Sequence, residues 1–156
     1  MTAGSAARRG PPRMKKTMLV GGVGDGKTTF RQQLLGQEIR YAKTQTMDVD
    51  QGILDTPGEY LEHVRFQRAL QVASYDVELI VLLLEATRDH CRIPPNYAAA
   101  FNADIIGVVT KIDLATSTQI ADAEGQLWQA GARAVFHVNC HNGAGFEKVR
   151  RELWAS

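Results

Sequence analysis

The chain has little of what several classes of protein require. It contains two cysteines, Cys91 and Cys140, without paired metal-ligand spacing, which argues against a disulfide framework and fits a reducing cytosol. Its most apolar run, residues 79–84, is far too short to span a bilayer, and a net charge of +1 gives no case for nucleic acid or an acidic membrane as partner. We therefore expect a soluble, cytoplasmic protein that binds neither membrane nor nucleic acid.

Acidic residues are also missing before Asp25, and Ala, Gly, Ser, Pro and Arg dominate residues 1–13. We expect these residues to be a disordered basic tail or a non-native extension, since Met14 would make a good start. A docking or encapsulation peptide is the alternative, whereas the lack of an apolar segment argues against an export signal. A length of 156 residues then predicts one domain, residues 14–156.

Short apolar runs alternate with helical stretches, which predicts an α/β fold. The expected architecture has three layers, a mostly parallel central sheet with helices on both faces. Gly36 is expected to end the first helix, and residues 37–50 to form a mobile loop with at most a short edge strand at 47–49. The predicted strands are residues 17–20, 52–54, 78–84, 105–110 and 134–138; the predicted helices are residues 27–35, 62–74, a short Ala-rich turn ending at Phe101, 117–130 and 145–154.

The stretch after the first strand matches the P-loop pattern G-x-x-x-x-G-K-[ST], with a strand before it and a helix after it. Glycines lack a Cβ, so backbone N–H groups can approach phosphate oxygens closely, and the helix presents its positive end to the same anion. A glycine-rich turn in an ordinary α/β domain is the alternative. The residues expected around phosphate are Gly21, Gly22, Val23, Gly24, Asp25, Gly26, Lys27, Thr28 and Thr29.

Side chains of this stretch and of the next strand end have separate chemical roles. We expect Lys27 to reach the terminal phosphates and Thr28 to give its hydroxyl to Mg²⁺. Asp55, directly after the second strand, is placed to hold the same ion through a water, and Gly58 can bring a backbone N–H to the γ-phosphate. Without a P-loop upstream, Asp55 to Gly58 would be interpreted as a plain turn.

The sequence Thr110-Lys111-Ile112-Asp113 begins at the last residue of the predicted strand 105–110. A carboxylate at Asp113 can accept hydrogen bonds from guanine N1–H and the exocyclic amine, while adenine has no matching donors. Lys111 would lay its aliphatic stem along the base. The alternative is a surface lysine and an aspartate that caps the next helix, a role that Thr116 or Ser117 could fill equally well.

A last segment, residues 138–146, follows the fifth strand and precedes the last helix. It resembles the V-S-A-x-x-G-x-G-L segment of guanine-nucleotide proteins, with Asn139 where Ser is common and Cys140 where Ala is common. Backbone N–H groups of Asn139, Cys140 and His141 would contact the guanine carbonyl. A small, buried role for Cys140 is favoured over a redox or nucleophilic one.

With these motifs in order, the chain looks like a compact Ras-like P-loop GTPase of the translation-factor-related class, which would make residues 14–156 a P-loop G domain. A closer resemblance is to the EutP/PduV family of ethanolamine and propanediol utilisation proteins, carried by residues 43–45, 53–60 and 92–94. The resemblance implies that Thr44, with Thr46 as alternate, is the switch threonine that ligates Mg²⁺. It also implies association with a bacterial microcompartment, through its shell or encapsulated enzymes, and an acetate kinase assignment in some members.

Two residues depart from the Ras-like pattern. Val23 occupies a position where Ras proteins use glycine, so its side chain would crowd the γ-phosphate. Glu59 occupies the position of the glutamine that orients water; its carboxylate could orient or deprotonate water, but it would also repel the phosphate charge. We therefore predict slow hydrolysis of GTP.

The leading hypothesis is a protein that binds GTP and GDP with Mg²⁺ and hydrolyses GTP slowly, with Lys27, Thr44 and Glu59 nearest the chemistry. The first alternative is a phosphotransferase of the acetate kinase type, using ATP or GTP, whose acceptor pocket would draw on Arg40, Lys43, His63 and Arg65. The second is a nucleotide-binding scaffold with negligible turnover. The sequence leaves the downstream partner, the operon type and the oligomeric state open.

Overall fold

The computed structural model describes residues 13–22, 26–45, 52–56, 64–87 and 93–155, with the backbone alone for residues 13, 37–45, 64 and 155. A five-stranded sheet forms its centre, in the strand order β3-β2-β4-β5-β6, and every neighbouring pair is parallel. The strands are β2 Thr17–Gly21, β3 Ile53–Asp55, β4 Leu79–Glu85, β5 Asp104–Thr110 and β6 Val135–His137. The predicted α/β fold with a parallel sheet is confirmed, with strand bounds shifted by a residue or two.

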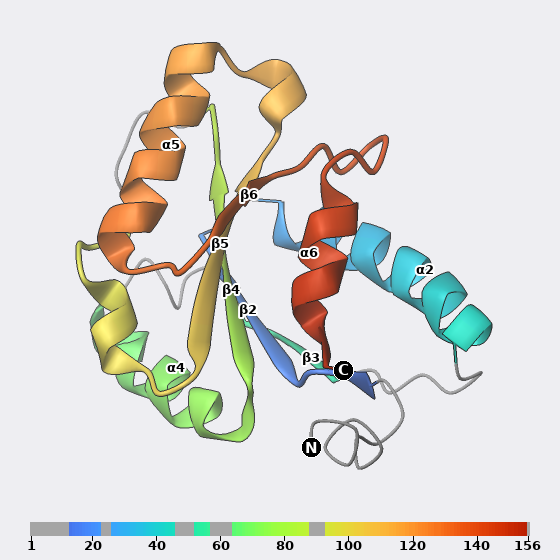
Figure 1. Ribbon diagram of the computed structural model, residues 1–156. Helices are drawn as coiled ribbons and strands as arrows, with labels where there is room; N and C mark the ends of the chain where they lie inside the picture. The colour runs from blue at the N-terminus through green and yellow to red at the C-terminus, as the bar shows by residue number, and fades with distance from the viewer. Residues whose placement is uncertain (1–12, 23–25, 46–51, 57–63, 88–92, 156) are drawn as a thin grey trace, which may run out of the picture.

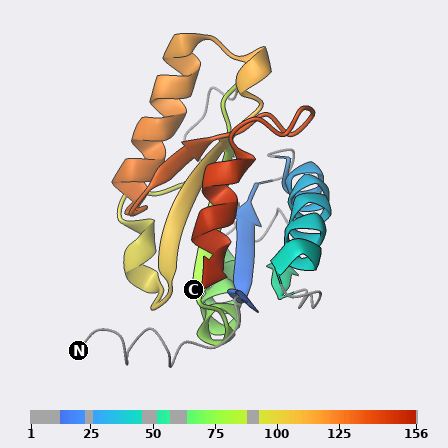
Figure 2. The same ribbon diagram turned by 45° about the vertical axis from the view of Figure 1, so that its right-hand side comes forward.

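Helices cover both faces of this sheet, as Figures 1 and 2 show from two directions. α4 and α5 lie on one face, and α2 and α6 on the other (Figure 1). The helical elements are α2 Lys27–Gln45, η1 Val64–Phe66, α4 Gln67–Ala73, η2 Ser74–Asp76, η3 Tyr97–Ala100, η4 Ile112–Leu114, α5 Ser117–Ala130 and α6 Phe146–Leu153. The predicted three-layer arrangement is therefore present.

The two faces of the sheet build two separate cores. Along β4, alternate side chains point to opposite faces, as a strand requires. Ile80, Leu82 and Leu84 join the core under α4 and α5, whereas Leu79, Val81 and Leu83 join the core under α2 and α6. In the second core, Phe30 of α2 and Phe146 of α6 pack with ring centroids 5.2 Å apart. Because both faces of β4 are buried, its sequence is nearly continuously apolar.

The first helix is longer than the sequence prediction. α2 does not end at Gly36 but continues to Gln45, so the expected loop over residues 37–50 is wrong for 37–45. Gly36 is not among the described glycines with a positive φ, so it does not adopt the left-handed cap conformation. The residues after it are mostly good helix formers, and they carry the helix on. The possible strand at 47–49 lies outside the described residues.

Short elements differ in smaller ways. Val72, expected among the apolar positions of the helix predicted at 62–74, is 56% exposed, while Leu70 of the same helix is buried. β1 Arg13–Met14 pairs antiparallel with β7 Trp154–Ala155, so Arg13, assigned to the tail by sequence, lies in a strand. This pairing joins the two ends of the described chain. No helix in the described parts of the chain has the length and apolar character to cross a membrane.

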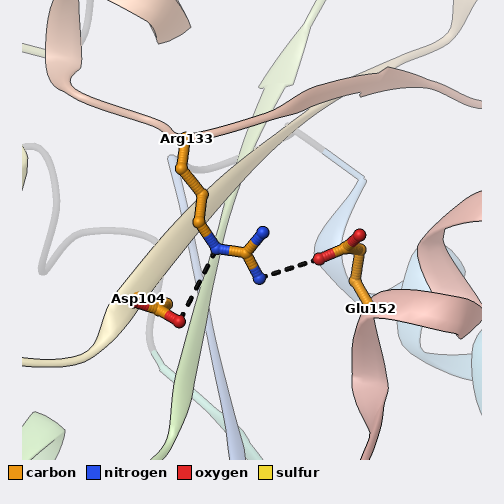
Figure 3. A network of polar contacts seen from close by, with 3 residues as sticks. All are labelled: Asp104, Arg133 and Glu152. Atoms are coloured by element: carbon orange, nitrogen blue, oxygen red, sulfur yellow. Dashed lines mark hydrogen bonds and ion pairs between the residues drawn. The ribbon is translucent and has the colours of Figure 1, made fainter.

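At the amino ends of the strands, Arg133 links three elements (Figure 3). Its Nε lies 3.6 Å from Asp104 Oδ2 at the start of β5, and its Nη2 lies 2.7 Å from Glu152 Oε1 on α6. Its backbone N–H donates to Ile105 O at 2.8 Å. Arg133 thus connects α6 to the amino end of β5.

Candidate functional site

The residues singled out by sequence lie at the carboxyl ends of the parallel strands. The strand order changes direction between β2 and β4, since the chain passes from β2 outward to β3 and then back to β4 on the other side. In open α/β sheets, ligands bind in the crevice above such a switch point. The segments that follow β2, β3, β5 and β6 are therefore candidates to contact one and the same ligand.

The phosphate side of the site is formed by the ends of β2 and β3. Lys27 is the first residue of α2, and its Nζ lies 3.3 Å from Asp55 Oδ1, at the end of β3. A Cβ on Gly21 would lie 3.2 Å from Lys27 Cγ and 3.3 Å from Leu83 O, so the lysine stem passes directly over the glycine backbone. A larger residue at position 21 would displace this stem. The predicted phosphate-binding cation and the predicted metal carboxylate are thus next to each other.

The loop that leads into α2 has the backbone that the motif requires at its described end. Gly26 has φ +83°, a conformation that glycine adopts without steric cost. Thr28 and Thr29 are exposed in the first turn of α2, where backbone N–H groups have no partner within the helix. Gly22 is buried. Val23, Gly24 and Asp25 lie outside the described residues.

The metal side of the site has one described carboxylate. Asp55 is paired with Lys27, and the next residue, Thr56, is buried and donates from Oγ1 to Leu19 O at 2.7 Å. This bond ties the end of β3 to β2. Among the residues that the structure describes, no three His, Cys, Asp or Glu side chains gather as a metal site. A divalent ion here would depend on Asp55, on Thr28 and on ligand oxygens, while Gly58 and Glu59 fall outside the described ranges.

Thr44 does not lie beside Thr28 in this conformation. It is in the last turn of α2, and sixteen residues of helix separate the two threonines by about 24 Å along the axis. Both could hold one ion only if α2 ended earlier in the chain. Its alternate, Thr46, lies outside the described residues.

The base side of the site follows β5. Lys111 has φ 60° and ψ 37°, a left-handed conformation that is uncommon for a residue other than glycine. It turns the chain into η4, which carries Asp113 in an exposed position. Thr110, the last residue of β5, is fully buried, and its Oγ1 lies 3.7 Å from where a Cβ on Gly26 would be. The phosphate and base segments are therefore neighbours.

The capping alternative for Asp113 is not what the structure has. Thr116 is the N-cap of α5, and its side chain accepts from Gln119 N at 3.1 Å. Gln119 Oε1 in turn accepts from Thr116 N at 2.9 Å, which completes a capping box. Asp113 is thus left with no capping duty at the start of α5.

A compact loop after β6 carries the other residues that the sequence predicts around the base. Asn139 N donates to Ala144 O at 3.0 Å, and Asn139 Oδ1 accepts from His141 N at 2.9 Å. Gly145 has φ +87°, and a Cβ there would lie 2.0 Å from His137 O. The loop is therefore fixed against the end of β6 by backbone packing that only glycine permits.

Cys140 shows that this loop faces the segment after β5. Burial raises the pKa of its thiol to about 11; the Asp113 carboxylate adds to the rise and the Lys111 ammonium opposes it. The three predicted base residues are thus close enough to interact electrostatically. A thiol with a raised pKa is a poor nucleophile at neutral pH, which argues against the redox or nucleophilic alternative. The preferred buried role is met only in part, because Cys140 is half-buried.

Two histidines near this loop have no metal-ligand company in the described chain. His141 is exposed, while His137 Nε2 lies 2.6 Å from Glu124 Oε1. Glu124 Oε2 also accepts from Trp128 Nε1 at 3.1 Å, and these two bonds lower the pKa of Glu124, the Trp128 bond more strongly. The contact joins α5 to β6 and is structural.

Sequence reasoning missed one charged residue at this edge. Glu85, the last residue of β4, places Oε2 3.4 Å from Lys111 Nζ, and its Oε1 accepts from Thr87 Oγ1. The sequence prediction ended that strand one residue earlier. The rule that found Asp55, a polar residue directly after a buried strand, would also have found Glu85.

Taken together, the described residues fit a magnesium-bound nucleoside phosphate. The glycine backbone at 21 and 26 leaves room that a Cβ would fill, and Lys27 supplies positive charge there. Asp113 supplies an exposed hydrogen-bond acceptor on the other side. Such a ligand, when bound, would bring a transferable phosphoryl group, while these residues bind and orient it.

Comparisons with known proteins agree on one family. A family model described as "Ethanolamine utilisation - propanediol utilisation" matches residues 14–155. "Propanediol utilization protein PduV" of Citrobacter freundii is 35% identical over 136 residues, which are 87% of this chain and 91% of that protein. A protein of Escherichia coli (strain K12) named "Probable acetate kinase EutP" is 31% identical over 131 residues, 83% of this chain and 82% of that one.

Solved structures show the same fold at lower identity. The translation elongation factor SelB from Methanococcus maripaludis, in complex with the GTP analogue GPPNHP, matches with a TM-score of 0.62 at 18% identity, over 92% of this chain and 34% of that chain. The FeoB G-domain from Methanococcus jannaschii matches with a TM-score of 0.58 at 17% identity, over 90% and 95% of the two chains. This chain thus spans about a third of the elongation factor but nearly all of a G-domain.

Proposed function

The chain belongs to the ethanolamine utilisation and propanediol utilisation family, and from that premise we propose that it binds GTP and GDP with Mg²⁺ and hydrolyses GTP slowly. The proposed ligand lies across the carboxyl edge of the sheet, with phosphates over β2 and the base beyond β5. Lys27 holds phosphate, Thr28 and Asp55 hold the ion, and Asp113 reads the base.

One observation supports this proposal. The proposed phosphate and base segments lie at the same edge of the sheet, and the distance between them is similar to the length of a nucleotide. β2 and β5 are separated by β4 alone, so their ends are about 10 Å apart. A nucleoside diphosphate extends over a similar distance. The Lys27–Asp55 pair stands at one end of this span, and Lys111 with Asp113 stands at the other.

Guanine is the proposed base because of the acceptor at Asp113. Its carboxylate would accept from N1–H and the exocyclic amine of guanine, whereas adenine would leave the charge without donors. The capping box at Thr116 supports this role, since it removes the main structural use for Asp113. The Asn139–Ala144 loop supplies the opposite wall.

Slow hydrolysis rests on the sequence alone. Val23 and Glu59 both lie outside the described residues, so the proposal depends on their chemistry: a branched side chain near the γ-phosphate and a carboxylate where a neutral amide orients water. Thr44 joins this group only if the end of α2 unwinds.

A phosphotransferase that uses ATP or GTP is the second candidate, and the specific support for it is the name "Probable acetate kinase EutP" given to relatives in Escherichia coli and Salmonella typhimurium. Acetate would need a cationic pocket near the γ-phosphate. Of the cations that sequence offers for it, Arg65 is the one whose side chain the structure describes. Its guanidinium lies 4.8 Å from the centroid of the Phe66 ring, so Phe66 holds it by a cation–π contact.

The cellular setting is proposed from the family. We place the chain in the cytoplasm, in a bacterial microcompartment system, where shell proteins or encapsulated enzymes are the candidate partners. The basic residues before Met14 are a candidate docking segment. A nucleotide-binding scaffold with negligible turnover is the remaining alternative.

The decisive experiment is a calorimetric titration of the protein with GDP, GTP, ATP and xanthosine diphosphate (XDP) in the presence of Mg²⁺. We expect tight binding of the guanine nucleotides and at least about a hundredfold weaker binding of ATP. Asp113→Asn should shift preference toward XDP, while Asp122→Asn, an exposed aspartate on α5, should leave all affinities unchanged. Equal affinity for ATP and GTP would refute the base assignment.

Product analysis then separates the candidate reactions. Incubation with GTP or ATP, Mg²⁺ and acetate is followed by assay for acetyl phosphate and for inorganic phosphate. Slow release of phosphate that acetate does not change supports the GTPase, and acetyl phosphate formation supports the kinase. A fast single-turnover rate without any partner would contradict the roles given to Val23 and Glu59.

A further inference from the structure

Glu85 forms a two-sided contact at the end of β4. Its side chain is 14% exposed, and its two carboxylate oxygens have different partners. Oε2 lies 3.4 Å from Lys111 Nζ, and Oε1 accepts a hydrogen bond from Thr87 Oγ1. The carboxylate is therefore held in a fixed orientation with one oxygen toward Lys111.

Lys111 is the residue on which the geometry of the base side depends. Its left-handed backbone turns the chain out of β5, and the turn is closed by Leu114 N donating to Lys111 O at 3.1 Å. A left-handed conformation is unfavourable for a lysine, and it persists where surrounding contacts hold it, here the backbone bond from Leu114 and the side-chain contact with Glu85. Asp113, two residues later, inherits its position from this turn.

The strands give Glu85 a rigid base. Glu85 is the register partner of Thr110, and Ala86 N donates to Thr110 O at 3.0 Å. β4 lies between β5 and β2, so a contact with Glu85 draws the Lys111 side chain back across the sheet, toward Gly26 and Lys27. That is the path that a nucleotide would follow from base to phosphate.

We propose that Glu85 is a positioning residue for the base site and acts through Lys111. The inference rests on the proposed function, because it gives Glu85 a role in nucleotide binding without contact to the nucleotide. Glu85 directs the lysine stem along the base and stabilises the turn that presents Asp113. Thr87 contributes by fixing the carboxylate.

A double-mutant cycle with GDP as the probe tests this role. Glu85→Gln keeps the shape of the side chain, and we expect it to raise the Kd for GDP about five- to tenfold. In a Lys111→Ala chain, the same change should alter the Kd by less than about twofold, because the residue through which Glu85 acts is gone. Thr87→Val should follow the same pattern with about a twofold effect.

Two further measurements exclude a merely structural effect. Urea unfolding of each variant without nucleotide gives the free energy of unfolding. We expect a small loss, because Glu85 stabilises the turn, and the Kd should rise although every variant remains fully folded under the binding conditions. Glu152→Gln is the matched control, because it removes the partner of Arg133 at the opposite end of the sheet. It should leave the Kd for GDP unchanged.

The outcomes are distinct. Equal effects of Glu85→Gln with and without Lys111, or no effect in either, overturn the inference while the proposed function stands. If the unaltered chain does not bind GDP, the proposed function and this inference both fail. If Glu85→Gln does not fold, Thr87→Val in the two backgrounds decides in its place.

Discussion

The two ends of the central sheet use charged side chains in different ways. At the amino ends of the strands, Arg133, Asp104 and Glu152 join a loop, a strand start and a helix (Figure 3). At the same end of the sheet, Lys16 N donates to Glu78 Oε1 at 3.0 Å. At the carboxyl ends, Lys27 and Lys111 pair with carboxylates of neighbouring strands, Asp55 and Glu85.

The difference lies in the backbone beneath these charges. The carboxyl-end lysines sit in or beside turns with positive φ, at Gly26 and at Lys111 itself. Arg133 also follows a turn with positive φ, at Gly131 two residues earlier, but its own N–H makes a strand-like bond to Ile105 O. Conformations that cost energy persist where the surroundings hold them, and they gather at functional sites. The Arg133 cluster at the amino end therefore stabilises the fold, while at the carboxyl end the left-handed Lys111 holds a strained backbone where a ligand is proposed.

Gly145→Ala, at the carboxyl end of the sheet, should have the largest effect on stability. A Cβ at this residue would lie 2.0 Å from His137 O, and φ +87° disfavours alanine in addition. We expect a loss of about 3 kcal/mol or more in the free energy of unfolding, measured in urea. The control is Gly125→Ala, in the middle of α5 with nothing within 4 Å, which should raise that free energy by up to about 1 kcal/mol.

Lys27→Ala should remove function while leaving the fold intact. Its ammonium is the described positive charge over Gly21, so we expect GDP and GTP to bind more than about a hundredfold more weakly by calorimetry. Lys148→Ala, an exposed lysine on α6, is the matched control and should bind normally. Nucleotide binding that survives the loss of Lys27 would place the phosphates elsewhere.

Much of this architecture follows from local sequence patterns. The alternation of apolar runs and amphipathic stretches gives the parallel sheet and its order of elements, because burial on both faces makes β4 and β5 almost entirely apolar. The bounds of α5 follow from its own residues, since Thr116 caps its start and Gly131, at φ +105°, ends it. Each of these signals acts within a few residues.

The missed features depend on contacts that are distant in sequence. β1 and β7 are two residues long and pair only because the two ends of the chain meet. Glu85 matters because the register of β4 and β5 sets it beside Thr110. α2 passes Gly36 because the helix has no left-handed cap there. The rule for strand ends predicts that Lys27, Asp55 and Asp113 lie at the carboxyl edge of the sheet, as they do in the structure. The rule does not predict which side chains pair with one another there.

Cys140 offers a probe of the charges at the carboxyl end. Burial raises its pKa from 9.0 to about 11, so the folded chain keeps the thiol protonated across the range in which an unfolded chain loses the proton. Any stability from this shift is present below about pH 9 and is lost as the pH rises toward 11. In a Cys91→Ser chain, alkylation by iodoacetamide at pH 8 should be up to about a hundredfold slower folded than in urea.

Substitutions of two residues near Cys140 should change the alkylation rate in opposite directions. Asp113→Asn removes a charge that raises the thiol pKa and should speed alkylation, while Lys111→Ala removes a charge that lowers it and should slow alkylation. Rates that respond to neither change would contradict the closeness of the two base segments. In the Cys91→Ser chain with Asp113 and Lys111 unaltered, GDP, if bound as proposed, should protect the Cys140 thiol from alkylation.

Arg133→Met should have the smallest effect and sharpen the contrast between the two ends. The Arg133 side chain is 41% exposed, so its two ion pairs are weakened by water, and we expect a loss of about 0.5–1 kcal/mol in the free energy of unfolding at low salt. At 1 M NaCl the loss should shrink, because salt screens exposed charges beyond about 3 Å. The Kd for GDP should not change, since Arg133 lies at the opposite end of the strands from Lys27 and Lys111. A higher Kd would mean that losing the Arg133 contacts shifts α6 and the Asn139–Ala144 loop that precedes it. The two ends of the sheet would then not be independent.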